Sequence, residues 1–297
     1  MYTEIDSNKR KTAILIAAFT AVIIGIGWVL GETWGDAYFG IIVAVVIATI
    51  MNLIAFYKGD SVALLTAGAR AIEKQENPDL YNLVENLAIT AGLPTPKIYI
   101  INDSSPNAFA TGRDPEHASI AITSGLLQIM TRQELEGVIA HEMSHVKNYD
   151  IRIMTLIVVL VGTVMLLSDI LMRSIIFRGR GDKNNNAAQI QLVLFLVGLI
   201  LAILSPFLAE LIKMAVSRSR EYLADASAAL LTRYPEGLAS ALQKIAHIDQ
   251  PLKKASHATA HLYLANPFDP RVTKKFELWF STHPPIEERI KKLRGML

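Results

Sequence analysis

The apolar residues of the chain are gathered into four uncharged blocks that are separated by polar stretches. The blocks cover residues 12–30, 37–57, 153–168 and 187–209, which is 19, 21, 16 and 23 residues. A helix needs about 20 apolar residues to cross the hydrocarbon core of a bilayer. The pattern therefore predicts about four transmembrane helices. The third block extends to Met172 only across Asp169, so a buried core helix is the alternative there.

The charges beside these blocks predict their orientation. Lys9-Arg10-Lys11 precedes the first block, whose apolar stretch is too long for a signal peptide, so we expect a retained anchor. Lysine and arginine collect on the cytoplasmic side of membranes. With the N-terminus inside, the inner flanks hold nine of these residues, against four in the loop after the third block. Both termini and residues 58–150 are thus predicted to be cytoplasmic, with a re-entrant second hairpin as the alternative.

The polar middle region predicts a small domain of helices and strands. From Ser61 to Ala91 the apolar residues recur at helical spacing, and Asn77-Pro78 divides this pattern into two helices. Three runs of strand-forming residues follow and predict a three-stranded sheet, at residues 97–101, 107–112 and 118–123. A free edge of an antiparallel sheet can bind an extended peptide as an added strand, unless loops or lipid cover it.

The helix predicted after the sheet carries the sequence H-E-M-S-H, from His141 to His145. Thr131 and Glu134 predict its start as a capping box. Residues four apart lie about 40° apart around a helix, so both histidines can face one ion, with Glu142 close enough to contact a water on it. Two imidazoles and a carboxylate suit Zn²⁺, with Glu142 as general base. The alternative is two ordinary histidines on an amphipathic helix.

A third metal ligand is expected elsewhere in the chain, because a catalytic zinc has three protein ligands and one open position. Glu221 and Asp225 are four residues apart, shortly after the fourth block. Glu221 is the candidate ligand, and Asp225 is a candidate acceptor for the second ring N–H of a ligand histidine. A helix continuing from each of the last two blocks would bring His145 and Glu221 to a similar depth. The alternative is an exposed acidic pair on a helix surface.

Composition narrows the choice of function. The 297 residues include no cysteine, carry a net charge of +2 and are 52% hydrophobic. Any zinc site must therefore use histidine and carboxylate ligands. There is no basic run beyond the membrane flanks to indicate nucleic acid binding, and no G-x-x-x-x-G-K-[ST] sequence to indicate ATP binding. We expect neither nucleic acid nor ATP as a partner.

Four short sequences follow one another along the chain: N-A-F-A-T-G, H-E-M-S-H, R-E-Y-L-A-D and S-T-H-P-P, which begin at residues 107, 141, 220 and 281. Together with the hydrophobic blocks they resemble the HtpX family of membrane zinc metalloproteases, which is related to the CAAX prenyl proteases. The resemblance covers nearly the whole chain, residues 9–297. It implies a mainly helical α+β fold, in which a zincin-type metalloprotease domain with a small sheet is fused to about four transmembrane helices.

The resemblance also implies roles for particular residues. The ligands of one zinc ion per chain match His141, His145 and Glu221, and the catalytic base matches Glu142. The strand edge that pairs with substrate matches Asn107, Ala108, Phe109 and Ala110. His283 matches a histidine beside the active site that stabilises the oxyanion, although a histidine before two prolines can equally be structural.

The implied organisation has four parts: a transmembrane hairpin, the first part of the catalytic domain, a second transmembrane or re-entrant hairpin, and the second part of the catalytic domain, at residues 1–60, 61–150, 151–214 and 215–297. The implied activity is cleavage of misfolded or damaged membrane proteins at the cytoplasmic face, in protein quality control under stress. The partners are then polypeptide substrates and the lipid bilayer of the cell membrane.

Two other classes of function remain open from the residues alone. One is a non-proteolytic membrane scaffold or channel with a structural zinc, and the other is a metallohydrolase that acts on another substrate. A structural zinc is enclosed by four protein ligands, and the sequence offers three. A structural site would also leave Glu142 without a task, so the protease is the preferred hypothesis.

Overall fold

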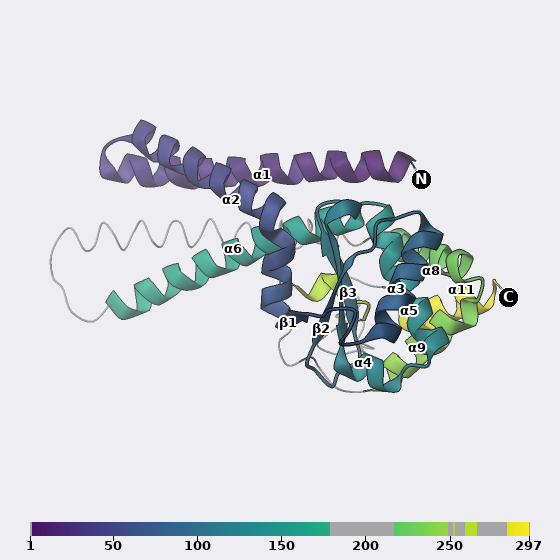
Figure 1. Cartoon of the computed structure of the whole chain (residues 1–297). Helices are drawn as coiled ribbons and strands as arrows, with labels where there is room; N and C mark the ends of the chain where they lie inside the picture. Colours follow the sequence, from purple (N-terminus) through teal and green to yellow (C-terminus); the bar gives the residue numbers. More distant parts are fainter. Residues whose placement is uncertain (1, 179–216, 249–251, 253–258, 266–283, 297) are drawn as a thin grey trace.

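The computed structural model describes residues 2–178, 217–248, 252, 259–265 and 284–296. Two long helices, α1 (Tyr2–Trp34) and α2 (Ala37–Ala67), form a hairpin at the start of the chain. The tip of this hairpin and the end of α6 (Asp150–Arg178) project from the same side of a body that holds the sheet and the shorter helices (Figure 1).

Small residues allow α1 and α2 to pack closely. A Cβ atom on Gly40 of α2 would overlap the backbone oxygen of Gly27 and the Cα of Gly31 on α1. Two small residues four positions apart, here Gly27 and Gly31, are typical of helix pairs in membranes. Among the described residues, two helical segments are long and apolar enough to cross a membrane, Ile5–Glu32 and Ala37–Ala67, and only 22% of each apolar window is buried. The first two predicted spans therefore have the length and exposure that a lipid-facing hairpin needs.

The sheet has four strands, one more than the sequence pattern predicts. Its order is β1-β2-β4-β3, with strands β1 (Ala69–Ala71), β2 (Lys97–Ile101), β3 (Ala108–Gly112) and β4 (Ala118–Thr123). β2 and β4 are parallel, whereas β1 and β2, and β3 and β4, are antiparallel, so the sheet is mixed. The first helix predicted from residue 61 is wrong in its second half, because α2 ends at Ala67, Gly68 caps it in the left-handed region (φ 68°) and β1 follows.

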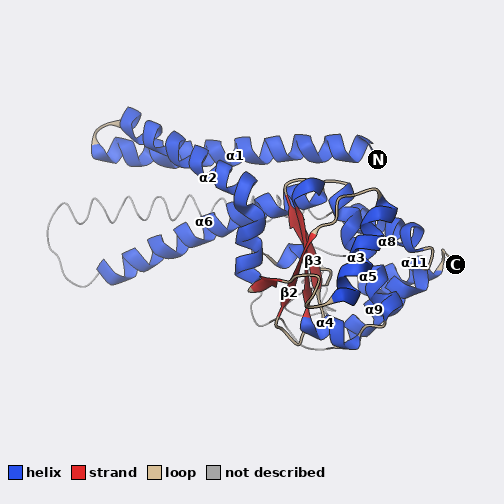
Figure 2. Cartoon of the chain, viewed as in Figure 1, coloured by secondary structure: helices blue, strands red, loops and turns tan. Residues whose placement is uncertain are grey.

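Both faces of the sheet are covered, as the alternation of side chains along each strand requires. Ile98, Ile120 and Ile122 pack into one core with α3 (Pro78–Ala91), α5 (Arg132–Lys147) and α9 (Pro235–His247). Phe109 and Ala121 point to the other face and pack against α2 and α6. The sheet thus lies between the long helices and the shorter ones (Figure 2). The described part of the chain also contains α4 (Ser124–Ile129), α8 (Arg218–Thr232), α11 (Ile286–Arg294) and the 3₁₀ turns Pro115–His117 and Ala260–Leu262.

The third predicted span lies within α6, but the first half of that helix is part of the body. Residues 151, 153–161 and 164 are buried, and this part of α6 contacts α1, α2 and β3. An apolar run by itself does not distinguish a core helix from a spanning one. The fourth predicted span, residues 187–209, lies outside the described residues, so four transmembrane helices are not confirmed.

Candidate metal centre

The start of α5, the helix that carries both histidines, is fixed by the predicted capping box, which the structure confirms. Thr131 Oγ1 accepts a hydrogen bond from the Glu134 N–H, and the Glu134 carboxylate accepts one from the Thr131 N–H. Lys244 and Ser240 of α9 also donate to this carboxylate, each at 2.6 Å. The apolar stripe of α5 packs into the core, and the two histidines are buried with it.

Glu221 and Asp225 lie one turn apart on α8 and are both buried against α5. α8 begins after Ser217, whose backbone is extended (φ −81°, ψ 138°), so the helix does not continue from the preceding residue. α5 likewise ends before Tyr149, which is in the left-handed region (φ 61°) and turns the chain into α6. The expectation of unbroken helices between the apolar blocks and the candidate ligands is therefore wrong at Tyr149 and at Ser217. Packing of α5 against α8 brings these residues together instead.

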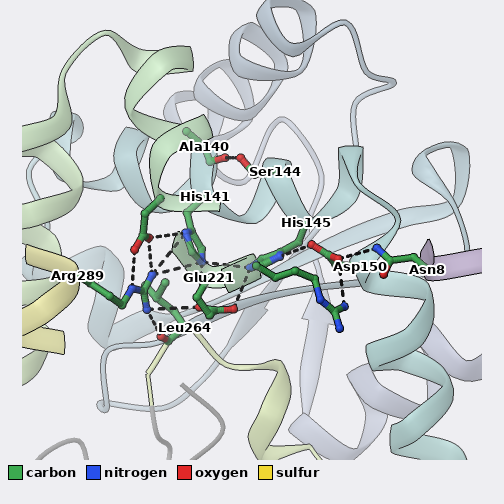
Figure 3. A network of polar contacts seen from close by, with 11 residues as sticks. Asn8, Ala140, His141, Ser144, His145, Asp150, Glu221, Leu264 and Arg289 are labelled. Atoms are coloured by element: carbon green, nitrogen blue, oxygen red, sulfur yellow. Dashed lines mark hydrogen bonds and ion pairs between the residues drawn. The ribbon is translucent and has the colours of Figure 1, made fainter. Parts of the chain in front are cut away.

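Three side chains converge between α5 and α8 (Figure 3). Nε2 of His141 lies 3.2 Å from Nε2 of His145. Glu221 places Oε2 3.7 Å from His141 Nε2 and Oε1 3.5 Å from His145 Nε2. Ligand atoms at about 2.0–2.1 Å from a tetrahedral zinc are about 3.3 Å from one another, so the three side chains fit one ion.

Each histidine has a carboxylate against its other ring nitrogen. His141 Nδ1 lies 3.0 Å from Asp225 Oδ1, and His145 Nδ1 lies 3.0 Å from Asp150 Oδ2. A carboxylate in this position accepts the Nδ1–H hydrogen bond and leaves Nε2 to bind a metal. The structure thus places Asp225 where the sequence reasoning expects an acceptor, and it adds Asp150 as a second one.

Arg289 of α11 is completely buried beside these residues. Its guanidinium donates to both carboxylate oxygens of Asp225, at 2.7 and 2.9 Å, and to the Leu264 carbonyl at 3.1 Å. Its Nη1 lies 3.6 Å from Glu221 Oε2. Arg289 therefore supplies the positive charge that a buried group of carboxylates requires.

Burial and neighbouring charges shift the pKa values of the site. Burial raises the pKa of Glu142, although the two nearby histidines oppose the rise. Burial by itself lowers the pKa of His145, but the hydrogen bond with Asp150 and the surrounding carboxylates outweigh it and raise this pKa to about 9. Burial favours neutral Asp225, but Arg289 outweighs this effect and holds the pKa of Asp225 well below its usual range. The carboxylates therefore favour a positive charge, proton or metal ion, at the imidazoles.

Glu142 joins the donor group to the edge of the sheet. Its side chain is buried, and its carboxylate accepts a hydrogen bond from the Ala110 backbone N–H of β3. The Asn107 carbonyl accepts a hydrogen bond from the Thr123 N–H, so residues 107, 109 and 111 turn their backbone polar groups toward β4. The backbone N–H and C=O groups of residues 108, 110 and 112 point outward, away from β4.

The outward edge of β3 already has partners within the chain. The Ala108 carbonyl accepts a hydrogen bond from the Leu264 N–H at 3.0 Å, and the Gly112 N–H donates to Thr155 Oγ1 at 3.0 Å. The predicted substrate edge, Asn107 to Ala110, is thus an edge of the sheet that is covered at its N-terminal end. The carbonyls of Ala110 and Gly112 also lie on this outward edge of β3.

Sequence reasoning missed two residues of the site, Asp150 and Arg289. Arg289 falls in the middle of the apolar stripe of the C-terminal helix, between Ile286 and Leu293, where a buried charge requires a buried partner. Asp150 follows the second histidine by five residues and carries no such signal. His283 lies outside the described residues, so its role stays a prediction.

Comparisons with known proteins agree with this geometry. A model of Peptidase family M48 matches residues 74–297. The protease HtpX homolog of Dictyoglomus turgidum is 49% identical, over 99% of this chain and 94% of that protein. The protease HtpX homologs of Tropheryma whipplei and Caldanaerobacter subterraneus are 46% and 45% identical, over 100% and 97% of this chain and 98% and 95% of those proteins.

A solved structure shares the fold. The crystal structure of S. mikatae Ste24p aligns with a TM-score of 0.52 at 19% identity and covers 99% of this chain and 67% of that one. The match of a peptidase family over most of the chain favours the protease over the scaffold and over other hydrolases. The chain belongs to Peptidase family M48, among the HtpX-type membrane metalloproteases.

Proposed function

We propose that this protein is a zinc endopeptidase in which His141, His145 and Glu221 hold one zinc ion and Glu142 is the general base. The observation that supports this most directly is the convergence of three buried donors at the spacings of a tetrahedral site, with Glu142 buried beside them. When bound, zinc supplies Lewis acidity, which makes water more acidic and polarises the scissile carbonyl.

Glu142 is suited to move the proton of the reaction. Its carboxylate is buried beside His141 and His145, where it can contact a water on the ion that these residues would hold. It accepts the proton of the attacking water and then delivers this proton to the departing amine. The hydrogen bond from the Ala110 N–H holds the carboxylate at the edge of β3.

The proposed substrate is an extended polypeptide that lies along the outward edge of β3. The carbonyls of Ala110 and Gly112 accept backbone hydrogen bonds in this arrangement, largely independent of the substrate's side chains. Such recognition suits an enzyme that acts on many misfolded membrane proteins. Pairing begins at Ala110, because Leu264 already occupies the Ala108 carbonyl.

We propose further that the metal centre lies on the cytoplasmic face of the cell membrane. The excess of lysine and arginine on the inner flanks supports this orientation. The chain has no cysteine, so single cysteines can be placed cleanly. A cysteine at Thr33 in the hairpin tip is expected to react with an impermeant reagent from outside the cell, and one at Asn102 is not. The reverse pattern would overturn the orientation.

Glu142→Gln tests the proposed chemistry. Purified full-length protein in detergent is analysed for zinc content and for cleavage of casein, with and without chelator. The variant is expected to keep about one zinc per chain while cleavage falls by about 10²–10⁴-fold. Glu136→Gln, the same change on the same helix outside the donor group, is the matched control. If Glu142→Gln cleaves casein at the wild-type rate, Glu142 is not the general base. If the purified wild-type protein contains no zinc, the proposed metal centre is refuted.

A further inference from the structure

The first apolar helix reaches directly into the support of the metal centre. Asn8 of α1 is 1% exposed, and its side-chain amide donates two hydrogen bonds to residues 140 and 142 positions later in the sequence. One goes to Asp150 Oδ1 at 2.8 Å and the other to the Asn148 carbonyl at 2.9 Å. Both hydrogens of the amide group are therefore used on a single turn of the chain, and Figure 3 shows the bond to Asp150.

That turn joins the helix with the histidines to the next helix. Asn148 caps the C-terminus of α5, Tyr149 has a left-handed backbone (φ 61°), and Asp150 begins α6. A left-handed conformation is unfavourable for a residue other than glycine, so surrounding contacts must hold it. Asn8 supplies two of them, and Lys9, the next residue of α1, lies 5.4 Å from the centre of the Tyr149 ring.

The two oxygens of Asp150 have different tasks. Oδ1 accepts hydrogen bonds from Asn8 at 2.8 Å and from Arg220 at 3.2 Å, whereas Oδ2 faces His145 Nδ1 at 3.0 Å. The contacts at Oδ1 set the rotation of the carboxylate, and this rotation sets the direction of the hydrogen bond at Oδ2. The ring orientation of His145 depends on that bond.

We propose that Asn8 is a positioning residue of the metal centre: it fixes Asp150, which in turn orients His145 to bind the metal. The inference rests on the proposed function, since it takes His145 as a ligand. α1 is a continuous helix from Tyr2 to Trp34, and its uncharged block begins four residues after Asn8. A helix suited to the membrane thus contributes to the metal affinity of the catalytic body.

The test is a double-mutant cycle on zinc affinity in the full-length protein in detergent. The zinc dissociation constant is measured by competition with a chromophoric chelator for wild type, Asn8→Ala, Asp150→Ala and the double variant. Loss of a partner of a ligand histidine weakens metal binding by about 10–100-fold, which is the expectation for Asp150→Ala. Asn8→Ala acts on His145 only through Asp150 and is therefore expected to weaken zinc binding less, by about 3–10-fold. In the Asp150→Ala background, Asn8→Ala is expected to change nothing further.

Asn52→Ala is the matched control. Asn52 is also an asparagine of the hairpin, but its side-chain amide donates to Thr20 Oγ1 of α1 at 2.9 Å and not to the turn that holds Asp150. Its zinc affinity and the absorption spectrum of its cobalt form are expected to equal those of wild type, whereas Asn8→Ala alters the cobalt spectrum. This difference separates positioning from a general weakening of the hairpin.

Three results would overturn the inference. They are an affinity of Asn8→Ala equal to that of Asn52→Ala, effects of Asn8→Ala and Asp150→Ala that multiply in the double variant, or failure of both Asn8→Ala and Asn8→Ser, which keeps one hydrogen-bond donor, to fold. The variant Glu221→Ala distinguishes failure of the positioning role from failure of the proposed function, because it tests zinc binding at the metal centre and leaves Asn8 unchanged. If wild type binds zinc and Glu221→Ala does not, a negative result at Asn8 refutes the positioning role alone.

Discussion

Replacing Arg289 by methionine is expected to destabilise the protein strongly and to weaken its metal centre. Methionine keeps much of the length and apolar volume of the side chain but removes its charge and its donors. The change leaves the Asp225 carboxylate buried, 2% exposed, without the guanidinium that donates to both of its oxygens. It also removes the donor to the Leu264 carbonyl.

The magnitude follows from the burial of this ion pair. Removing one partner of a buried pair costs about 3–5 kcal/mol, because the other charge is left without compensation. Protonation of Asp225 limits the loss, since its pKa then rises from well below its usual range. For a chain of this size, about 1 kcal/mol corresponds to about 2–4 °C in unfolding temperature. The expected decrease is therefore about 6–20 °C.

The assay is a thermal scan at one fixed rate in one detergent, on metal-stripped and zinc-loaded protein, together with the zinc dissociation constant. Arg294→Met is the matched control on the same helix. Arg294 also makes a two-pronged contact with a carboxylate, Glu236, but its side chain is 44% exposed. Exposed pairs contribute about 0–1 kcal/mol, so its expected shift is at most a few degrees.

The double variant Arg289→Met/Asp225→Asn completes the experiment. Removing the orphaned charge is expected to recover part of the unfolding temperature, although zinc affinity stays about 10–100-fold weaker because His141 has lost its carboxylate. The reasoning is refuted if Arg289→Met melts no lower than Arg294→Met and binds zinc as tightly as wild type. It is also refuted if removal of Asp225 lowers the stability of Arg289→Met further.

Three more predictions concern the site, its supporting helix and the hairpin. Glu221→Ala is expected to lose zinc on dialysis, whereas Asp225→Ala retains it with about 10–100-fold weaker affinity; full retention by the first variant would reassign the third ligand. Burial favours protonated Glu134, but hydrogen bonds from α9 and the capping box outweigh this and lower its pKa to about 2 from an unfolded value of 4.5. Its ionised form therefore stabilises the fold above pH 4.5, and the gap in unfolding temperature between wild type and Glu134→Gln is expected to shrink as the pH falls from 4.5 to about 2; a constant gap would contradict this. Gly40→Ala is expected to separate α1 from α2 and lower the unfolding temperature, whereas Gly25→Ala, with nothing within 4 Å of the added Cβ, does not, and equal melting of the two would count against close packing of the hairpin.

Local patterns were enough to predict the helix that carries the two histidines and most strands. The capping box at Thr131 and the apolar stripe of α5 depend on residues three and four positions apart, so they can be read from the sequence. The spacing of His141 and His145 belongs to the same class, because one turn of helix places both rings on one side. β2, β3 and β4 each agree with a run of strand-forming residues.

The errors arose where distant segments decide the local structure. β1 has three residues, Ala69–Ala71, and is a strand because it pairs with β2, which begins 26 residues after it. The apolar run of α6 has the same composition whether lipid or protein surrounds it, and only the packing of α1, α2 and β3 buries its first half. Neither outcome follows from propensity or periodicity.

The sequence by itself determined which candidate chemistry the chain carries, because His141, Glu142 and His145 lie on one helix. The tertiary structure alone decided how that chemistry is held in place. Asn8, Asp150 and Arg289 reach the site from α1, α6 and α11, and their hydrogen bonds to it span up to 148 positions of sequence. In the sequence, Asn8 and Asp150 are indistinguishable from ordinary surface residues, and the apolar stripe around Arg289 indicates that this charge is buried but not which residue pairs with it. Once buried, each polar side chain must keep its hydrogen bond, because an unpaired polar group in the core destabilises the fold. The hydrogen bond therefore fixes the orientation of both partners.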